Sequence, residues 1–202
     1  MTTIDDTRAA TGARPHSHGG APTGSAPERF ASWNADDFAE PTARDEDWKF
    51  SPLRRLRPLL SAGAADGRLD WASTVPAGAR LEELAADDPL LREGPAPLDR
   101  IGALAAGNAP AAVVLRVDAG VELAEPVVLR LTGRDGALAW GRLVLDIGAQ
   151  AKAVVVLEYD GDARYGAVTT PLIGDGAHLT LVHVHNWEPT AVHDEHIGIR
   201  VG

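Results

Sequence analysis

A repeat near the C-terminal end of the chain constrains its fold more than any other feature of the sequence. Residues 147–151, Ile-Gly-Ala-Gln-Ala, recur in similar form as Ile-Gly-Asp-Gly-Ala at residues 173–177, 26 positions later. The apolar segments that follow also superpose, so that residues 151–159 align with residues 177–185. A repeat of this length accommodates two strands of about nine residues and two turns, which is one coil of a β-solenoid.

The rest of the C-terminal half has the composition of strands. Short runs rich in valine and leucine are separated by glycine, aspartate and proline, with no helical stretch between them. These runs are residues 113–117, 127–131, 143–147, 153–159 and 179–185. An antiparallel sandwich or barrel could give the same series of strands, and Asp-Gly pairs typical of hairpin turns occur at Asp135, Asp160 and Asp175. The strands alone leave both folds open, and the repeat favours the solenoid.

We divide the chain into three regions. Residues 1–29 are dominated by small and polar residues that cannot bury apolar surface, so we expect a disordered tail. His16 and His18 lie in this tail and are interpreted as solvated rather than as a metal tether. Residues 30–108 are expected to form an N-terminal helical region, and residues 109–202 an incomplete β-helix core.

Helix signals are found throughout the middle region. Thr42 and Asp45 fit a capping box, which predicts a helix reaching about Phe50. Ser51 followed by proline predicts a second helix, which Pro58 must kink or end. Leucine spacing predicts short amphipathic helical turns at 81–84 and 98–104. None of these segments suggests chemistry.

Charge and composition exclude several classes of function. The net charge of −10 disfavours a nucleic-acid partner or an anionic membrane surface. The absence of cysteine removes disulfides and thiolate chemistry from this chain. The N-terminus is polar rather than a signal peptide, and the longest apolar runs are too short to span a bilayer. We therefore expect a cytoplasmic protein.

Histidines near the C-terminal end are the candidates for metal binding. His183 and His185 alternate along a strand, so their side chains leave the same face. With Glu188 they resemble the cupin metal motif, although the spacing differs on both sides of the pair. The repeat places the two histidines where Leu157 and Tyr159 stand, which favours a packing role. We assign no metal ligand, and keep a small cupin-like metal-dependent β-barrel enzyme using His183 and His185 as the alternative.

Signals for catalysis are weaker still. The chain has neither a Gly-X-Ser-X-Gly nucleophile elbow nor a Walker phosphate loop. Asp146, Glu158 and Asp160 could suggest a glycosidase carboxylate pair, but their positions favour solvated carboxylates at the turns. We predict that the chain is not an enzyme and assign no catalytic or cofactor-binding residue.

Several segments of the chain match motifs of one known protein family and occur in the same order as in that family. Residues 46–56, Glu-Asp-Trp-Lys-Phe-Ser-Pro-Leu-Arg-Arg-Leu, are similar to the Glu-X-Trp-(Arg/Lys)-(Phe/Tyr)-Thr-X-Leu-X-X-Leu signature near the start of SufD proteins. Residues 155–161 and 173–179 match a later strand and turn of the family, in family order. Trp187 and His193 fall where SufD chains usually carry an aromatic residue and a histidine. The chain therefore resembles SufD, of the SufB/SufD family of iron–sulfur cluster assembly scaffolds.

The resemblance implies an N-terminal helical region followed by a right-handed parallel β-helix. It also implies a non-catalytic scaffold subunit of a SufBCD-type complex, with a SufB-like paralogue and a SufC-like ATPase as partners of the full-length protein. The family's cluster-ligand histidine and its partner-binding elements lie in its C-terminal half, so no such residue is carried onto this chain. We expect an N-terminal fragment that ends at Gly202 and holds no cofactor of its own.

Overall fold

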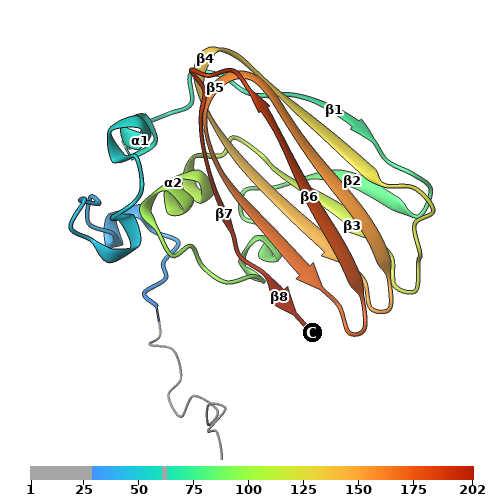
Figure 1. Cartoon of the computed structure of the whole chain (residues 1–202). Coiled ribbons are helices and arrows are strands. Elements are labelled where there is room, and N and C mark those ends of the chain that lie inside the picture. Colours follow the sequence, from blue (N-terminus) through green and yellow to red (C-terminus); the bar gives the residue numbers. More distant parts are fainter. Residues whose placement is uncertain (1–28, 61–62) are drawn as a thin grey trace, which may run out of the picture.

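The fold is mainly β with two α-helices in the part of the chain described by the computed structural model, residues 29–60 and 63–202 (Figure 1). The predicted disordered tail, with His16 and His18, lies outside the described residues except for Arg29. Figure 1 shows long, nearly parallel strands stacked side by side, with the helices gathered on one flank of the stack.

The stack is a parallel β-solenoid of about three turns, which confirms the predicted fold class. Its two longest strands, β4 and β5, are bent, so that each contributes to two faces of the coil. β4 pairs with β5 in parallel along almost their whole length. Later strands stack on β5 in the same direction. The strands are β3 (Ala112–Val117), β4 (Val127–Ile147), β5 (Lys152–Ile173), β6 (His178–Trp187), β7 (Val192–Ile197) and β8 (Arg200–Val201).

The register between β5 and β6 is the one that the repeat predicts. Leu157 pairs with His183 and Tyr159 pairs with His185, as the superposed segments require. Apolar side chains at equivalent positions of successive coils therefore stack in columns inside the solenoid, where Leu129 and Leu157 are completely buried. This interior, which we call the lumen, is the main core of the molecule.

The parallel pairing excludes the antiparallel sandwich or barrel that the strands alone had left open. The Asp-Gly pairs do not form hairpins. Asp135 and Asp160 lie inside β4 and β5, where the strands turn a corner of the coil, and Asp175 lies in the turn from β5 to β6. Each of the glycines that follow them has a positive φ, the conformation that tight corners require.

Two strands close the first coil, and they lie in the region expected to be helical. β1 (Asp70–Thr74) pairs antiparallel with β4, and β2 (Ala79–Leu84) pairs antiparallel with β3. The helical turn predicted at 81–84 is therefore wrong. Leu81 pairs with Leu115 of β3. Because residues 81–84 are too few to fix their own conformation, pairing with this distant strand makes them extended. The three-region division itself stays a prediction.

The helices follow the sequence signals only in part. α1 (Leu53–Leu60) follows Ser51 and contains Pro58, and α2 (Arg100–Asn108) is capped by Asp99, whose side chain accepts from Gly102 N at 2.8 Å. The helix predicted from the capping box at Thr42 is wrong, because only a 3-10 turn, Glu46–Trp48, forms there. Two further 3-10 turns span Ala35–Asp37 and Pro89–Arg92.

α1 and α2 pack on the outside of the solenoid. Leu56, Leu59 and Ile101 cover Trp140 and Val168, which leave β4 and β5 on the side away from the lumen. These strands are thus buried on both sides where the helices lie, as the nearly continuous burial of the second half of β5 shows. None of the helices in the described part of the chain is long and apolar enough to cross a membrane.

Candidate functional site

Chemically active side chains gather inside the last coil rather than on the surface. Alternation along β6 and β7 brings His183 and His185 from one strand and His193 and Glu195 from the next toward the ring of Tyr159 on β5. The Tyr159 ring stacks on His185, with centroids 5.2 Å apart, and lies 4.7 Å from the His193 ring. We call this group the lumen cluster; its members are Tyr159, Tyr165, Thr169, His183, His185, Trp187, His193 and Glu195.

Glu195 is the centre of the lumen cluster. Its side chain is only 7% exposed, and its two carboxylate oxygens accept hydrogen bonds from different strands. Thr169 donates to Oε1 at 2.5 Å, and His183 Nδ1 lies 3.1 Å from Oε2. The Tyr159 hydroxyl donates a longer bond to Oε2, at 3.4 Å. A buried carboxylate with this many donors is satisfied and held in one orientation.

The electrostatics of the cluster follow from burial and from these hydrogen bonds. Burial alone would raise the pKa of Glu195, but the bonds from His183 and Thr169 favour the charged form and leave the pKa below its usual value. Burial lowers the pKa of His193 to about 4, against the opposing attraction of Glu195. At neutral pH the cluster therefore combines an ionised carboxylate with an uncharged His193.

Hydrogen bonding also orients the rings of two histidines, His193 and His183. Trp187 Nε1 donates to His193 Nδ1 at 3.3 Å, so the single ring proton of His193 is on Nε2. In His183 the arrangement is reversed, because Nδ1 is the nitrogen that faces Glu195 and donates to it. Both Nε2 atoms are buried, and neither has a hydrogen-bond partner among the described residues. His193 Nε2 is 4.0 Å from Glu195 Oε2, which is too far for a hydrogen bond.

His183 Nε2 is the atom of the cluster best suited to act as a base or a ligand. A histidine whose Nδ1–H is fixed by a carboxylate is the usual arrangement behind a metal-bound imidazole. However, within residues 29–60 and 63–202 no three histidine, aspartate or glutamate side chains are placed to hold a metal ion together. The cupin-like alternative is wrong in its fold, because His183 and His185 lie on a solenoid strand and not in a barrel.

The other residues considered from the sequence are dispersed. Asp146 forms an ion pair with Arg116, and Glu158 forms one with Arg130, so these carboxylates serve different ion pairs along the solenoid. His196 lies on the opposite side of β7 from Glu195, where its Nδ1 is 3.4 Å from Asp99 at the start of α2. The structure does not bring these groups together into one site.

Sequence reasoning missed Glu195, although it named the histidines around it. The available signal was the alternation of His193 and Glu195, which places both on one face of a strand. That signal could not say that this face points into a closed interior, or that Thr169 and His183 from two other strands would meet the carboxylate there. Both contacts depend on how the coils stack.

Comparison with known proteins identifies the family to which the chain is related. An iron-sulfur cluster assembly SufBD family protein of Mycobacterium tuberculosis is 35% identical over 177 residues, which cover 87% of this chain and 45% of that protein. The chain is a homologue of the SufBD family. A SufBD family protein of Mycobacterium leprae is 34% identical over 166 residues, 81% of this chain and 42% of the relative.

The SufBD-like chain spans less than half the length of these relatives. No family model matches it, and no solved structure matches it either. The relationship to SufBD proteins and the parallel solenoid are therefore two independent findings, one from sequence identity and one from the pairing of strands.

Proposed function

We propose that the chain is a scaffold component of iron–sulfur cluster assembly, and that it is of the SufD type. The observation that carries this proposal is the 35% identity to SufBD family assembly proteins over 87% of the chain. The SufD-like segment at residues 46–56 supports the finer assignment. In the structure this segment forms the 3-10 turn Glu46–Trp48 and the start of α1 (Leu53–Leu60), which packs on the outside of the solenoid.

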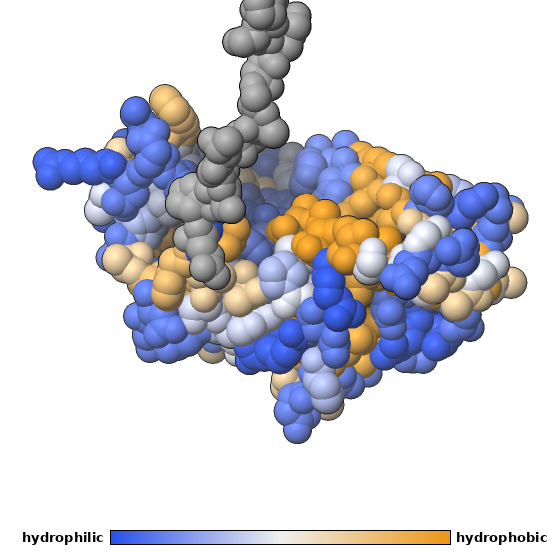
Figure 2. Space-filling model, turned by 90° about the horizontal axis from the view of Figure 1, so that it is seen from below, coloured by the Kyte–Doolittle hydropathy of each residue, from blue (hydrophilic) through white to orange (hydrophobic). Residues whose placement is uncertain are grey.

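A scaffold of this kind acts by presenting surfaces, and the last coil supplies one. Among the described strands, β6 pairs only with β5, so its outer edge has free backbone donors and acceptors. Exposed Val182, Ile199 and Val201 lie on this last coil. Figure 2, seen from below, shows a hydrophobic patch on the face toward which β8 and the C-terminus point in Figure 1. These features fit a surface that another chain covers, and we propose a SufB-like paralogue, with a SufC-like ATPase completing the complex.

In this role the chain is a non-catalytic cytoplasmic subunit with neither a nucleic-acid nor a membrane partner. The satisfied Glu195 and the packed rings of the lumen cluster support a structural role for that cluster. Iron and sulfide are then the cargo of the assembly complex rather than a resident cofactor of this chain.

Deletion of the coding sequence tests the proposal in the source organism. Enzymes that contain a [4Fe–4S] cluster, such as aconitase, should lose activity in extracts, and anaerobic treatment with iron and sulfide should restore it. Malate dehydrogenase, which has no cluster, is the control and should be unaffected. Unchanged aconitase activity in the deletion strain would contradict the proposal.

The finer assignment requires a binding test. An affinity-tagged chain co-expressed with the organism's SufB-like protein should retain it through purification. Preferential retention of an identical chain over the SufB-like protein would argue against the SufD-type role while leaving a role in cluster assembly open.

A further inference from the structure

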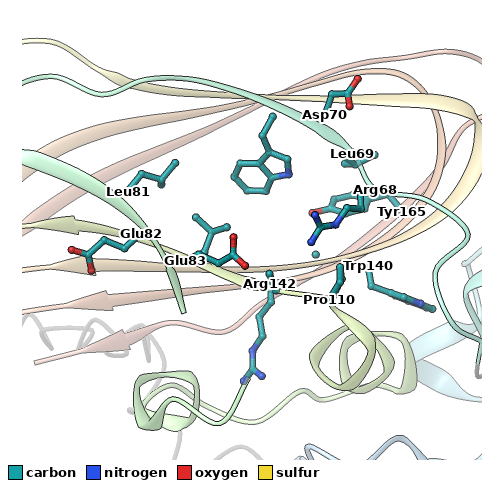
Figure 3. Close-up of a pocket in the computed structure, with 14 residues that line it drawn as sticks. Arg68, Leu69, Asp70, Leu81, Glu82, Glu83, Pro110, Trp140, Arg142 and Tyr165 are labelled. Carbon is teal, nitrogen blue, oxygen red and sulfur yellow. The ribbon is translucent and has the colours of Figure 1, made fainter. Parts of the chain in front are cut away.

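A cavity of about 520 Å³ opens at the end of the solenoid opposite the last coil. It lies between β1 and β2, and Figure 3 shows its lining residues converging from both strands and from β4 and β5. Trp71, Leu81 and Val113 give it apolar walls. Its volume and its aromatic lining are typical of pockets that bind small organic molecules.

Two of the five charged side chains that line this pocket are already neutralised by ion pairs. Asp70 is paired with Arg134, and Glu82 is paired with both Arg80 and Arg116. The carboxylates of Asp70 and Glu82 are therefore held by neighbouring arginines and are not free to bind a ligand.

Arg142 also lines the pocket, but its guanidinium group leaves it. That group donates to the carbonyl oxygens of Leu91 and Ala106, and Figure 3 shows the side chain extending away from the pocket. Arg142 is therefore not available to a ligand.

Arg68 and Glu83 remain without a partner. Neither side chain forms an ion pair or a hydrogen bond with any residue that the structure describes. Figure 3 shows the two charged groups extending into the pocket from opposite sides. The pocket thus offers one cation and one anion, separated by apolar surface.

Tyr165 adds a third polar group at the back of the pocket. The residue is 4% exposed, and its ring packs against Tyr159 and His193 of the lumen cluster. Its hydroxyl has no hydrogen-bond partner among the described residues, and burial raises its pKa, so it stays a neutral donor. Gly141 leaves room for this hydroxyl, because a Cβ at that position would lie 1.8 Å from it.

We propose that this pocket binds a free α-amino acid with a large apolar side chain. Arg68 and Tyr165, which lie on the same side of the pocket in Figure 3, receive the carboxylate, and Glu83 receives the ammonium group. The apolar side chain lies against Trp71 and Leu81. A zwitterion satisfies both free charges at once, whereas a simple anion or cation leaves one of them unpaired. The inference does not depend on the role in cluster assembly.

Three related probes test the charge requirement by titration calorimetry on the whole chain. L-phenylalanine carries both charged groups, 3-phenylpropionate lacks the ammonium group, and 2-phenylethylamine lacks the carboxylate. L-phenylalanine should bind about tenfold or more tightly than either of the others. Equal affinity for all three, or no saturable binding of L-phenylalanine, would overturn the proposal.

Substitutions then assign each charge. Arg68→Gln should weaken L-phenylalanine about tenfold and leave 2-phenylethylamine unchanged, and Glu83→Gln should weaken L-phenylalanine similarly and leave 3-phenylpropionate unchanged. Both residues are exposed, so the variants should fold normally, which circular dichroism verifies. Arg130→Gln and Glu122→Gln, outside the pocket, are the matched controls and should bind as the natural chain does. Unchanged L-phenylalanine affinity in Arg68→Gln and Glu83→Gln would also overturn it.

Discussion

Glu195 illustrates how single residues adjust their chemistry to the interior of the solenoid. Its burial would favour the neutral acid, yet donors from Thr169 and His183 keep it ionised. His193, one pleat away on the same face of β7, is buried and stays neutral. Asp194 points to the other side, toward Asp99 and His196, and burial together with Asp99 raises its pKa to about 6. The pKa of His193 is thus lowered and that of its neighbour Asp194 is raised, so acid changes the stability that each contributes in opposite directions.

The stability contributed by His193 should be lost in acid. Its pKa is about 4 in the folded chain and 6.5 for the free side chain, so the unfolded chain binds more protons between these values. Its contribution is therefore complete above about pH 6.5 and falls by roughly 3 kcal/mol as the pH drops to 4. In His193→Gln, urea unfolding at pH 4 to 7 should show a correspondingly weaker dependence on pH. His178→Gln, at an exposed position at the start of β6, is the control. An unchanged pH dependence in His193→Gln would show that this residue does not titrate as described.

Asp194 should have the opposite effect. Because its pKa is raised from 3.8 to about 6, the folded chain binds more protons, and the stability it contributes in acid is lost as the pH rises through 6. Asp194→Asn should therefore raise the free energy of unfolding at pH 7 by about 1–2 kcal/mol and change it little at pH 4. Chemical denaturation at both pH values measures this. The exposed Glu125→Gln should have no effect at either pH, and destabilisation by Asp194→Asn at pH 7 would refute the argument.

At the scale of elements, the long strands depend on glycine where they turn the corners of the coil. Gly133 of β4 pairs with Gly161 of β5, and Trp187 of β6 follows in the same stack. Gly161 has φ +76°, and a Cβ there would lie 2.2 Å from the Gly133 carbonyl oxygen. Both the backbone conformation and the close approach of the preceding coil therefore require glycine.

Alanine substitution separates these two requirements. Gly120 also has a positive φ, +73°, but a Cβ there would meet nothing within 4 Å. Gly120→Ala should cost about 1 kcal/mol from conformation alone, whereas Gly161→Ala should cost at least about 3 kcal/mol because a neighbouring backbone must also move. Thermal and urea unfolding measure the difference. Equal costs would mean that the stacked backbones at this corner are not as close as described.

At the scale of the whole molecule, the two ends of the solenoid differ. The first coil is closed by the antiparallel strands β1 and β2, and helices cover one flank. The last coil pairs on one side only within the described residues, and its edge combines free backbone groups with exposed apolar side chains. Such an edge readily pairs with another strand.

The chain by itself should therefore self-associate through this edge. Val182→Lys, on β6, should reduce association, because a charge on an edge strand opposes pairing. Val154→Lys is a matched control: Val154 is 38% exposed, close to the 39% of Val182, but it lies on β5, which is paired on both sides. Sedimentation velocity over a range of concentrations measures both. A monomer at all concentrations, or equal effects of the two substitutions, would contradict this prediction.

The sequence by itself favoured the solenoid over an antiparallel fold and predicted part of its register. The repeat at 147–151 and 173–177 paired Tyr159 with His185 correctly, because equivalent residues of stacked coils must face the same environment. The apolar spacing of residues 98–104 also predicted part of α2, because a helical period is a local signal. These features could be predicted because each depends on a short pattern in the sequence.

Only the tertiary structure decided the rest. Residues 81–84 carry a pattern too short to distinguish strand from helix, and pairing of β2 with β3 chose the strand. The lumen cluster likewise joins Thr169, His183 and Glu195 from three strands. The pocket beside Arg68 and Glu83 forms only where β1 and β2 close the first coil. In each case the contacts that decide the structure join residues far apart in the chain. These contacts exist only once the coils and strands have packed against each other, so no local pattern in the sequence can predict them.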